Sequence, residues 1–198
     1  MAGAAGTKGV PRAEREAQIL DIAAAEIGRV GYAGLSPAVV AAKAGVSKPL
    51  VYAYFDTKDG LYVACVRRAA TVLGDAIEAA MIDGPATLEL ADRTLAGIFG
   101  ALEPRPHDWH VVFDRSHPDE GPAADAARAA RRRIAEQANR GVGAFLAGRG
   151  LTDPDDLSAL SAVWMGTVTA LVGWWLRNPG ETAEAMTART RRLLAALT

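Results

Sequence analysis

The sequence predicts an all-α protein, and three observations support that prediction. Half of the 198 residues are apolar, only 6% are aromatic, and alanine, the best helix former, recurs throughout the chain. Apolar residues repeat at intervals of three and four, as on one side of a helix, rather than alternating as in a strand. Glycine and proline residues divide the chain into segments of helical length.

The expected helices begin at capping or proline residues and end at glycine or proline. The first runs from about residue 11 to residue 30, and Gly31 to Gly34 end it. Two short helices follow within residues 36–55, and Asp59 is expected to cap the next. The later helices are expected at 59–81, in a segment that ends at 102, and at 107–116, 123–146, 155–177 and 181–197. This makes nine helices.

The two short helices carry most of the functional information. Ser36 is expected to cap the first of them, with Pro37 at its first position, where a missing N–H costs nothing. Gly45 ends that helix, because glycine accepts the left-handed conformation common at helix ends. Ser47 is expected to cap the second, with Pro49 in its first turn. Two helices joined by a short glycine turn are typical of a helix-turn-helix, whose second helix enters the DNA major groove.

The motif also has a longer, more specific pattern. GVSKPLVYAYF at residues 45–55, followed by Lys58 and Leu61, resembles the signature of the tetracycline-repressor (TetR) family of transcription regulators, over roughly residues 12–62. The resemblance implies a DNA-binding domain at 1–60, with a flexible tail at 1–11, and a helical effector-binding and dimerisation domain at 61–198. It also implies a homodimer that binds a palindromic operator, most often as a repressor, and leaves it when a small apolar or aromatic effector binds. Leu50 and Ala53 depart from the family pattern, which often has threonine and a larger polar residue there.

The expected contacts with double-stranded DNA come from this segment. Lys48 is best placed to reach guanine, and Pro49 and Leu50 can pack on thymine methyl groups. By resemblance, Tyr52, Tyr54 and Lys58 hold phosphates, and the helix N-terminus assists Ser36. The full set of expected DNA-binding residues is Ser36, Ser47, Lys48, Pro49, Leu50, Tyr52, Tyr54 and Lys58. Without the family pattern, the tyrosines would be expected to pack inside the domain and Lys48 to be a solvated lysine.

Charge and cysteine content restrict the alternatives. The net charge is −1, and residues 1–60 hold seven Lys/Arg against six Asp/Glu, so composition alone does not indicate nucleic-acid binding. Cys65 is the only cysteine, which excludes an intrachain disulfide and fits a reducing cytoplasm. The N-terminus lacks the apolar core of a signal peptide, so a cytoplasmic location is expected.

One uncharged stretch, Leu157 to Leu176, is long enough to cross a membrane. Its bulky residues fall on one side and its small residues on the other, which favours a helix that packs on its own core and against a second subunit. We therefore expect no membrane insertion and a homodimer joined through the helices at 155–177 and 181–197. The apolar area would come from Trp164, Trp174, Trp175 and Leu194.

The larger domain offers candidates for an effector pocket. By resemblance, its lining is expected to include Phe99, Leu102, Trp109, Phe113, Trp164 and Met165. Apolar residues at helical spacing also occur in any ordinary core. The sequence does not decide whether each of these residues lines a pocket or belongs to the core.

A metal-responsive regulator is the first alternative. On an ideal helix, His107, His110, Asp114 and His117 share one narrow face, and all are metal-ligand types. A solvated polar side is the simpler interpretation, because closed metal sites draw ligands from separate elements. We therefore expect no metal site and no cofactor.

Two further alternatives are an enzyme and a helical interaction module that does not bind DNA. The chain has three histidines and one cysteine, and it lacks nucleophile-elbow, phosphate-loop and HExxH patterns. No enzyme activity is expected. The arginines around Arg131 to Arg133 are interpreted as a solvated helix face.

Overall fold

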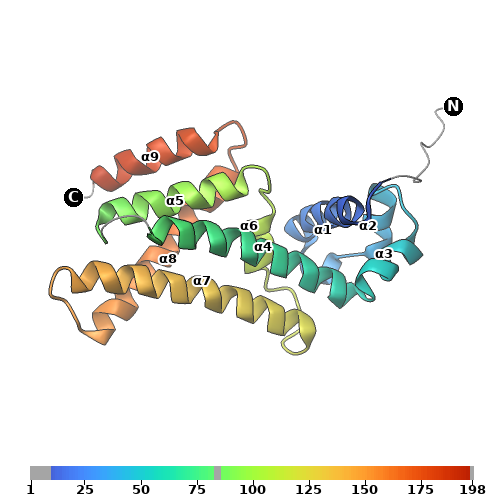
Figure 1. Ribbon diagram of the computed structural model, residues 1–198, viewed down its shortest axis with the longest axis horizontal. Helices are drawn as coiled ribbons and strands as arrows, with labels where there is room; N and C mark the ends of the chain where they lie inside the picture. The colour runs from blue at the N-terminus through green and yellow to red at the C-terminus, as the bar shows by residue number, and fades with distance from the viewer. Residues whose placement is uncertain (1–9, 83–85, 197–198) are drawn as a thin grey trace. The chain divides into compact units, whose positions relative to one another are not determined.

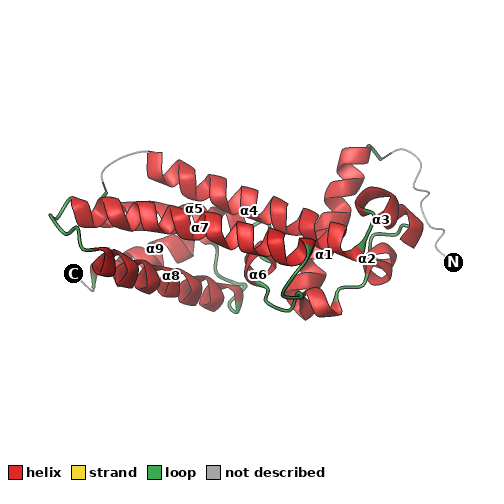
Figure 2. Ribbon diagram, turned by 90° about the horizontal axis from the view of Figure 1, so that it is seen from below, coloured by secondary structure: helices red, strands yellow, loops and turns green. Residues whose placement is uncertain are grey.

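A computed structural model describes residues 10–82 and 86–196 of the chain. Within these residues it contains helices joined by turns and loops, and no strand (Figure 2). The all-α prediction is therefore confirmed. The nine helices of the described residues are α1 Arg12–Gly34, α2 Pro37–Lys43, α3 Lys48–Phe55, α4 Lys58–Ile82, α5 Leu88–Leu102, α6 Asp108–Phe113, α7 Pro122–Ala147, α8 Pro154–Leu176 and α9 Ala183–Ala195. Of the expected tail at 1–11, residues 1–9 lie outside the described residues.

Helix α1 is interrupted at the glycine where the sequence predicts its end. Gly31 has φ +67° inside α1, a conformation that favours glycine. A Cβ at this position would lie 2.2 Å from Ser116 Oγ. The chain therefore changes direction at Gly31 and brings the following residues against the segment after α6.

The expected cap of α4 was wrong by two residues. Thr57 caps this helix, since its Oγ1 accepts the N–H of Gly60 at 2.9 Å. Asp59 lies inside the first turn and instead accepts a 2.5 Å hydrogen bond from the Tyr32 hydroxyl. A local sequence pattern cannot distinguish these two roles, because Tyr32 is 27 residues away in the chain.

Helix α6 is shorter than the predicted 107–116. It ends at Phe113, and Asp114 has an extended backbone with ψ 136°. The Asp114 carboxylate accepts the N–H of Ser116 at 3.0 Å, which is a local turn that competes with continued helix.

The packing divides the chain into two compact units: unit 1 is Met1–Ala69 with His107–Arg128, and unit 2 is Ala70–Pro106 with Ala129–Thr198. This division differs from the expected domain boundary after residue 60, because α6 packs against α1. Tyr62 is fully buried in unit 1, where its ring meets that of Tyr32 edge to face at 5.0 Å.

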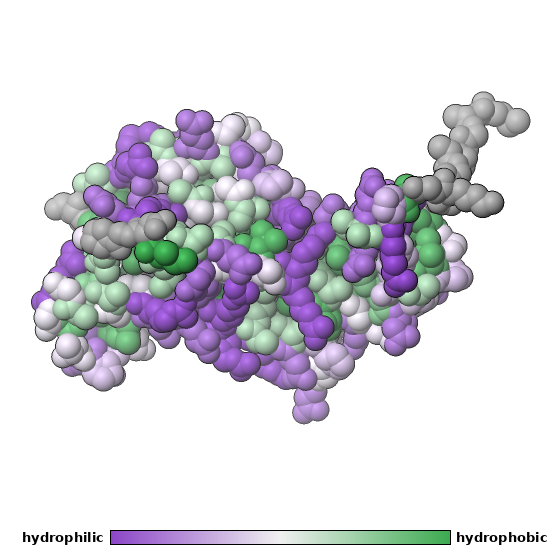
Figure 3. Space-filling model, in the orientation of Figure 1, coloured by the Kyte–Doolittle hydropathy of each residue, from purple (hydrophilic) through white to green (hydrophobic). Residues whose placement is uncertain are grey.

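In unit 2, α5 lies along α9 (Figure 1). Arg191 and Asp92 pair at 2.7 Å between these helices, and the Glu103 carboxylate accepts the N–H of Ala183 at 2.7 Å. The core of this unit includes Leu73, Leu95, Phe99, Leu102, Val172 and Met186. Hydrophilic side chains lie over much of α7 on the face shown in Figure 3.

Candidate nucleic-acid interface

Helices α2 and α3 are joined by a tight turn whose backbone N–H groups at Gly45 and Val46 form hydrogen bonds to carbonyls of α2. Gly45 has φ +64°, its N–H bonds to Ala42 O at 3.2 Å, and the N–H of Val46 bonds to Ala41 O at 3.0 Å. This pair of bonds is the Schellman ending of a helix. Ser47 then caps α3, because its Oγ accepts the N–H of Leu50 at 3.3 Å. Ser36 occupies the N-cap position of α2 without a side-chain capping bond.

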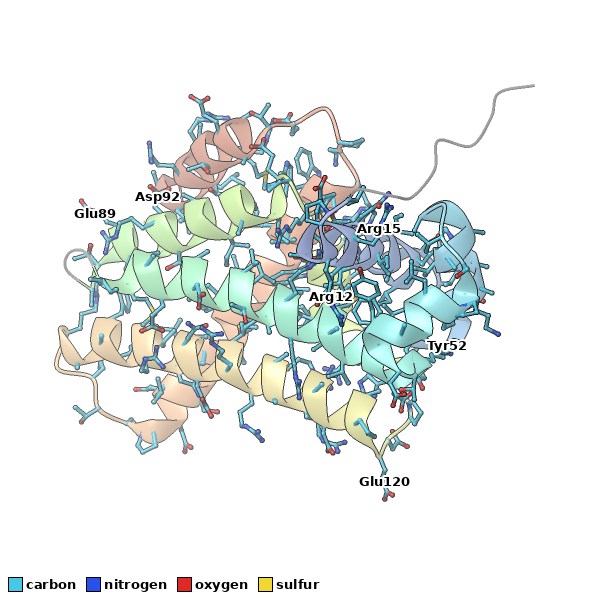
Figure 4. All side chains as sticks on the ribbon, turned by 45° about the vertical axis from the view of Figure 1, so that its right-hand side comes forward. Arg12, Arg15, Tyr52, Glu89, Asp92 and Glu120 are labelled. Carbon is cyan, nitrogen blue, oxygen red and sulfur yellow. The ribbon has the colours of Figure 1, made fainter. Side chains whose placement is uncertain are left out.

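The two sides of α3 differ sharply in burial. Val51 and Phe55 are buried, as is Val40 of α2, so these residues hold α3 in unit 1. The outward side, which we call the recognition face, consists of Lys48, Pro49, Leu50, Tyr52 and Ala53. Leu50 is half-buried, and the other four are exposed; Tyr52 is labelled in Figure 4.

Cations lie over the aromatic rings around this face. Lys48 Nζ is 5.5 Å from the centre of the Tyr52 ring, and Arg12 Cζ is 5.0 Å from that of Tyr54. Such contacts stabilise a cation while leaving it able to meet solvent or phosphate. Sequence reasoning did not select Arg12 (Figure 4), because only the folding of unit 1 brings it to Tyr54.

Lys58 and Ser36 complete the expected set of DNA contacts. Lys58 Nζ lies 4.4 Å from the Tyr32 ring centre and donates to the Ala33 carbonyl at 3.2 Å, and the lysine is half-buried. Ser36 is also half-buried, and Ser47 is exposed. All eight expected residues therefore belong to unit 1, around α2, α3 and the start of α4.

A buried carboxylate fixes α2 to α1. Glu26 is 4% exposed; it pairs with Arg29 at 2.8 Å and with Lys43 of α2. The hydrogen bonds from Arg29 and Lys43 lower the pKa of Glu26 to about 2. Because Lys43 pairs with Glu26, the charge of Lys43 is less available to a partner such as DNA.

The expected effector residues fall in both units. Phe99 and Leu102 are buried in unit 2, where the Phe99 ring meets Trp175 at 5.3 Å. In unit 1, the Trp109 and Phe113 rings are 4.4 Å apart. Trp164 and Met165 are half-buried on α8.

One cleft of about 230 Å³ in unit 2 is lined by Glu103, Pro106, Trp175, Leu176, Pro179, Gly180, Glu181 and Thr182. None of the six expected effector residues lines this cleft.

The arrangement on which the metal alternative depends is not formed. Because α6 ends at Phe113, Asp114 and His117 do not continue the helical face of His107 and His110. The Asp114 carboxylate is occupied by the Tyr32 N–H at 3.0 Å and the Tyr62 hydroxyl at 3.1 Å. In the described part of the chain, no three His, Cys, Asp or Glu side chains gather as metal ligands do.

The uncharged helix α8 keeps much of its apolar surface open. By length and composition it could cross a membrane, and 17% of its most apolar window is buried within the chain. Val163 is 62% exposed and Trp174 is 37% exposed, whereas Trp175 is buried. The Trp175 indole N–H donates to Glu181 O at 2.8 Å, so this tryptophan belongs to the core of its own unit and not to an outer surface.

Comparisons with known proteins agree with this geometry. The family model of bacterial regulatory proteins of the tetR family matches residues 19–65, from within α1 to within α4. A TetR-like transcriptional regulator from Rhodococcus sp. RHA1 is similar in structure, with 24% identity, a TM-score of 0.70, and coverage of 91% of this chain and 93% of that one.

Two further solved structures share the fold at lower identity. The transcriptional regulator FadR from Bacillus subtilis, in complex with stearoyl-CoA, has 16% identity, a TM-score of 0.68, and coverage of 91% and 96% of the two chains. AibR, in complex with isovaleryl coenzyme A and operator DNA, has 17% identity, a TM-score of 0.71, and coverage of 89% and 96%. Residues 19–65 thus match the tetR family of bacterial regulatory proteins, and the chain shares its fold with these solved regulator structures.

Proposed function

We propose that this protein is a TetR-family regulator that binds a palindromic operator as a homodimer in the cytoplasm and represses transcription until a small, largely apolar effector binds unit 2. The observation that carries the proposal is the recognition face. A capped helix α3 is held by buried Val51 and Phe55, while Lys48, Pro49 and Tyr52 are exposed on its other side. This is the arrangement that a helix needs in order to enter the major groove.

The proposed contacts divide into base readout and phosphate binding. Lys48 donates to guanine O6 and N7, and Pro49 and Leu50 meet thymine methyl groups. Tyr52, Tyr54 and Lys58 hold phosphates, together with Ser36 and Ser47 at the starts of α2 and α3, where backbone N–H groups favour anions.

Replacing Lys48 tests the readout. Lys48→Ala should weaken binding to the selected operator by about 1–3 kcal/mol and should affect random DNA less. Arg132→Ala, which removes an exposed cation from α7 in unit 2, is the charge-matched control. The operator is first obtained by selection from random duplex oligonucleotides, and affinities are then measured by fluorescence anisotropy at fixed salt. Equal losses on operator and random DNA would show that Lys48 reads no base.

The proposed homodimer joins the outer sides of α8 and α9. Val163 is 62% and Leu193 is 50% exposed in the single chain, and apolar area of this kind is usually covered by a partner. Val163→Asp should therefore shift sedimentation toward a monomer, while Ala135→Asp at an exposed position of α7 should not. A wild-type monomer at micromolar concentration would contradict the proposal.

Effector binding is proposed to change operator affinity through the dimer. An effector that prefers one dimer geometry can move the two recognition faces away from the half-site spacing. FadR with stearoyl-CoA and AibR with isovaleryl coenzyme A and operator DNA support an effector with a substantial apolar part. The alternative, a helical module that does not bind DNA, predicts that selection yields no preferred sequence and that any binding is insensitive to salt.

A further inference from the structure

Gln137 is a polar residue buried in the core of unit 2. The residue is 2% exposed on α7, and its Nε2 donates to Gly74 O at 2.7 Å and to Glu78 Oε2 at 2.9 Å. Both amide hydrogens are therefore used by α4. Gly74 has no side chain to cover its carbonyl, and a Cβ there would lie 2.6 Å from Arg133 Cζ.

These bonds fix the orientation of the amide. If the group were flipped, its oxygen would face the Gly74 carbonyl and the Glu78 carboxylate, which are both acceptors. Hydrogen bonds from Gln137 and from Arg140, at 2.5 Å, lower the pKa of Glu78, so Glu78 stays ionised near neutral pH. The amide oxygen, Oε1, must then point away from α4.

Gln137 Oε1 is buried and has no hydrogen-bond partner among the described residues. A buried acceptor without a partner is costly, and proteins usually satisfy such groups. The Ser161 hydroxyl on α8 is buried in the same unit and also lacks a partner among those residues. Helices α7 and α8 pack together where a Cβ on Gly143 would meet Leu157 at 3.8 Å.

Besides the charged groups of Glu78 and Arg140, Gln137 has buried apolar neighbours along α7. Ile134, Ala138 and Val142 are buried within about one turn of it. One turn after Gln137 is Gly141, where an added Cβ would meet only the side-chain ends of Leu90 and Met81, at 3.8 and 3.9 Å. A ligand that reaches Oε1 would therefore need an apolar body and one hydrogen-bond donor.

We propose that Gln137 Oε1 is the polar anchor of the effector site and accepts a hydrogen bond from the hydroxyl of an uncharged, otherwise apolar molecule, with the Ser161 hydroxyl as a second partner. This inference rests on the proposed function, in which unit 2 binds an effector. An uncharged ligand is favoured because burying an unpaired charge is far more costly than burying a hydroxyl. Because the oxygen is already oriented and already desolvated, a ligand that donates to it removes an existing penalty.

Matched probes with and without a hydroxyl test this proposal. The pairs are 1-decanol with methyl nonyl ether, which are isomers, and 2-naphthol with 2-methoxynaphthalene. Binding is measured by tryptophan fluorescence and calorimetry on the wild-type chain, Gln137→Met and Ser161→Ala. Gln18→Met, the same substitution at an exposed glutamine of α1, is the control.

In at least one pair, the hydroxyl probe should bind the wild-type chain about tenfold more tightly than its ether. Gln137→Met should remove this preference, Ser161→Ala should reduce it, and Gln18→Met should preserve it. Equal binding of alcohol and ether to the wild-type chain, or no binding of any probe, would overturn the proposal. Both outcomes are measured on the wild-type chain, so they do not depend on whether a variant folds.

Operator binding by the probe-free wild-type chain is measured separately. If the operator is bound and no alcohol preference is found, the anchor alone is wrong. If no DNA sequence is selected, the proposed function fails, whatever the probes do.

Discussion

The buried carboxylate of Glu26 offers a test of how the DNA-binding helices are held. Glu26→Gln keeps the shape of the side chain but removes its charge, so the ion pairs with Arg29 and Lys43 are lost. The two cations are half or more exposed, so solvent screens their attraction to the carboxylate. The pKa shift from 4.5 to about 2 corresponds to about 3 kcal/mol without screening, and we expect about 1–2 kcal/mol after it.

The pH dependence has a definite sign. A carboxylate whose pKa is lower in the folded chain stabilises the fold above its unfolded pKa, and this contribution is lost as the pH falls through the folded value. The unfolding free energies of wild type and Glu26→Gln should therefore differ by a constant amount above about pH 5. The difference should shrink between the two pKa values, 4.5 and about 2.

Urea titrations followed by circular dichroism from pH 7 to pH 3 measure this difference. Glu16→Gln, the same change at an exposed position of α1, should alter the free energy of unfolding by less than about 0.5 kcal/mol. If the curves for wild type and Glu26→Gln stay parallel through acid pH, or if the variant is as stable as wild type at pH 7, then the ion pairs do not hold α2 to α1.

Further predictions concern two glycines, the cap of α4 and Asp114, and urea unfolding measures each. Gly60→Ala should destabilise the chain by more than about 2 kcal/mol, because a Cβ there would lie 1.9 Å from the Phe55 carbonyl oxygen. At Gly100 an added Cβ would have no atom within 4 Å, so Gly100→Ala should stabilise the chain by about 0.5–1 kcal/mol. If Gly60→Ala proved more stable than Gly100→Ala, the steric argument would be refuted. Thr57→Ala should cost about 1 kcal/mol by removing the cap of α4, and no change would reassign that cap. Asp114→Asn should cost about 1–3 kcal/mol, since an amide N–H₂ then faces hydrogen-bond donors, and an equally stable variant would contradict this.

The sequence alone determined the helical class and the helix-turn-helix. Both depend on short-range features: apolar spacing, the glycine at position 45 and the cap at Ser47 act within a few residues, so they are readable in one dimension. Val51 and Phe55 have the spacing of one side of a helix, which agrees with their burial. The family pattern added the expected roles of Tyr52, Tyr54 and Lys58 as DNA contacts, which stay predictions.

Tertiary structure decided everything that depends on partners distant in the chain. Asp59 does not cap α4, because Tyr32 takes its carboxylate, and the helix expected to carry four metal-ligand side chains stops at Phe113, because Asp114 bonds to α1 and to Ser116. The amide oxygen of Gln137 points away from α4 because α4 accepts both of its amide hydrogens. Side chains of these types have several possible hydrogen-bond partners, and only the packing of helices far apart in sequence selects one of them.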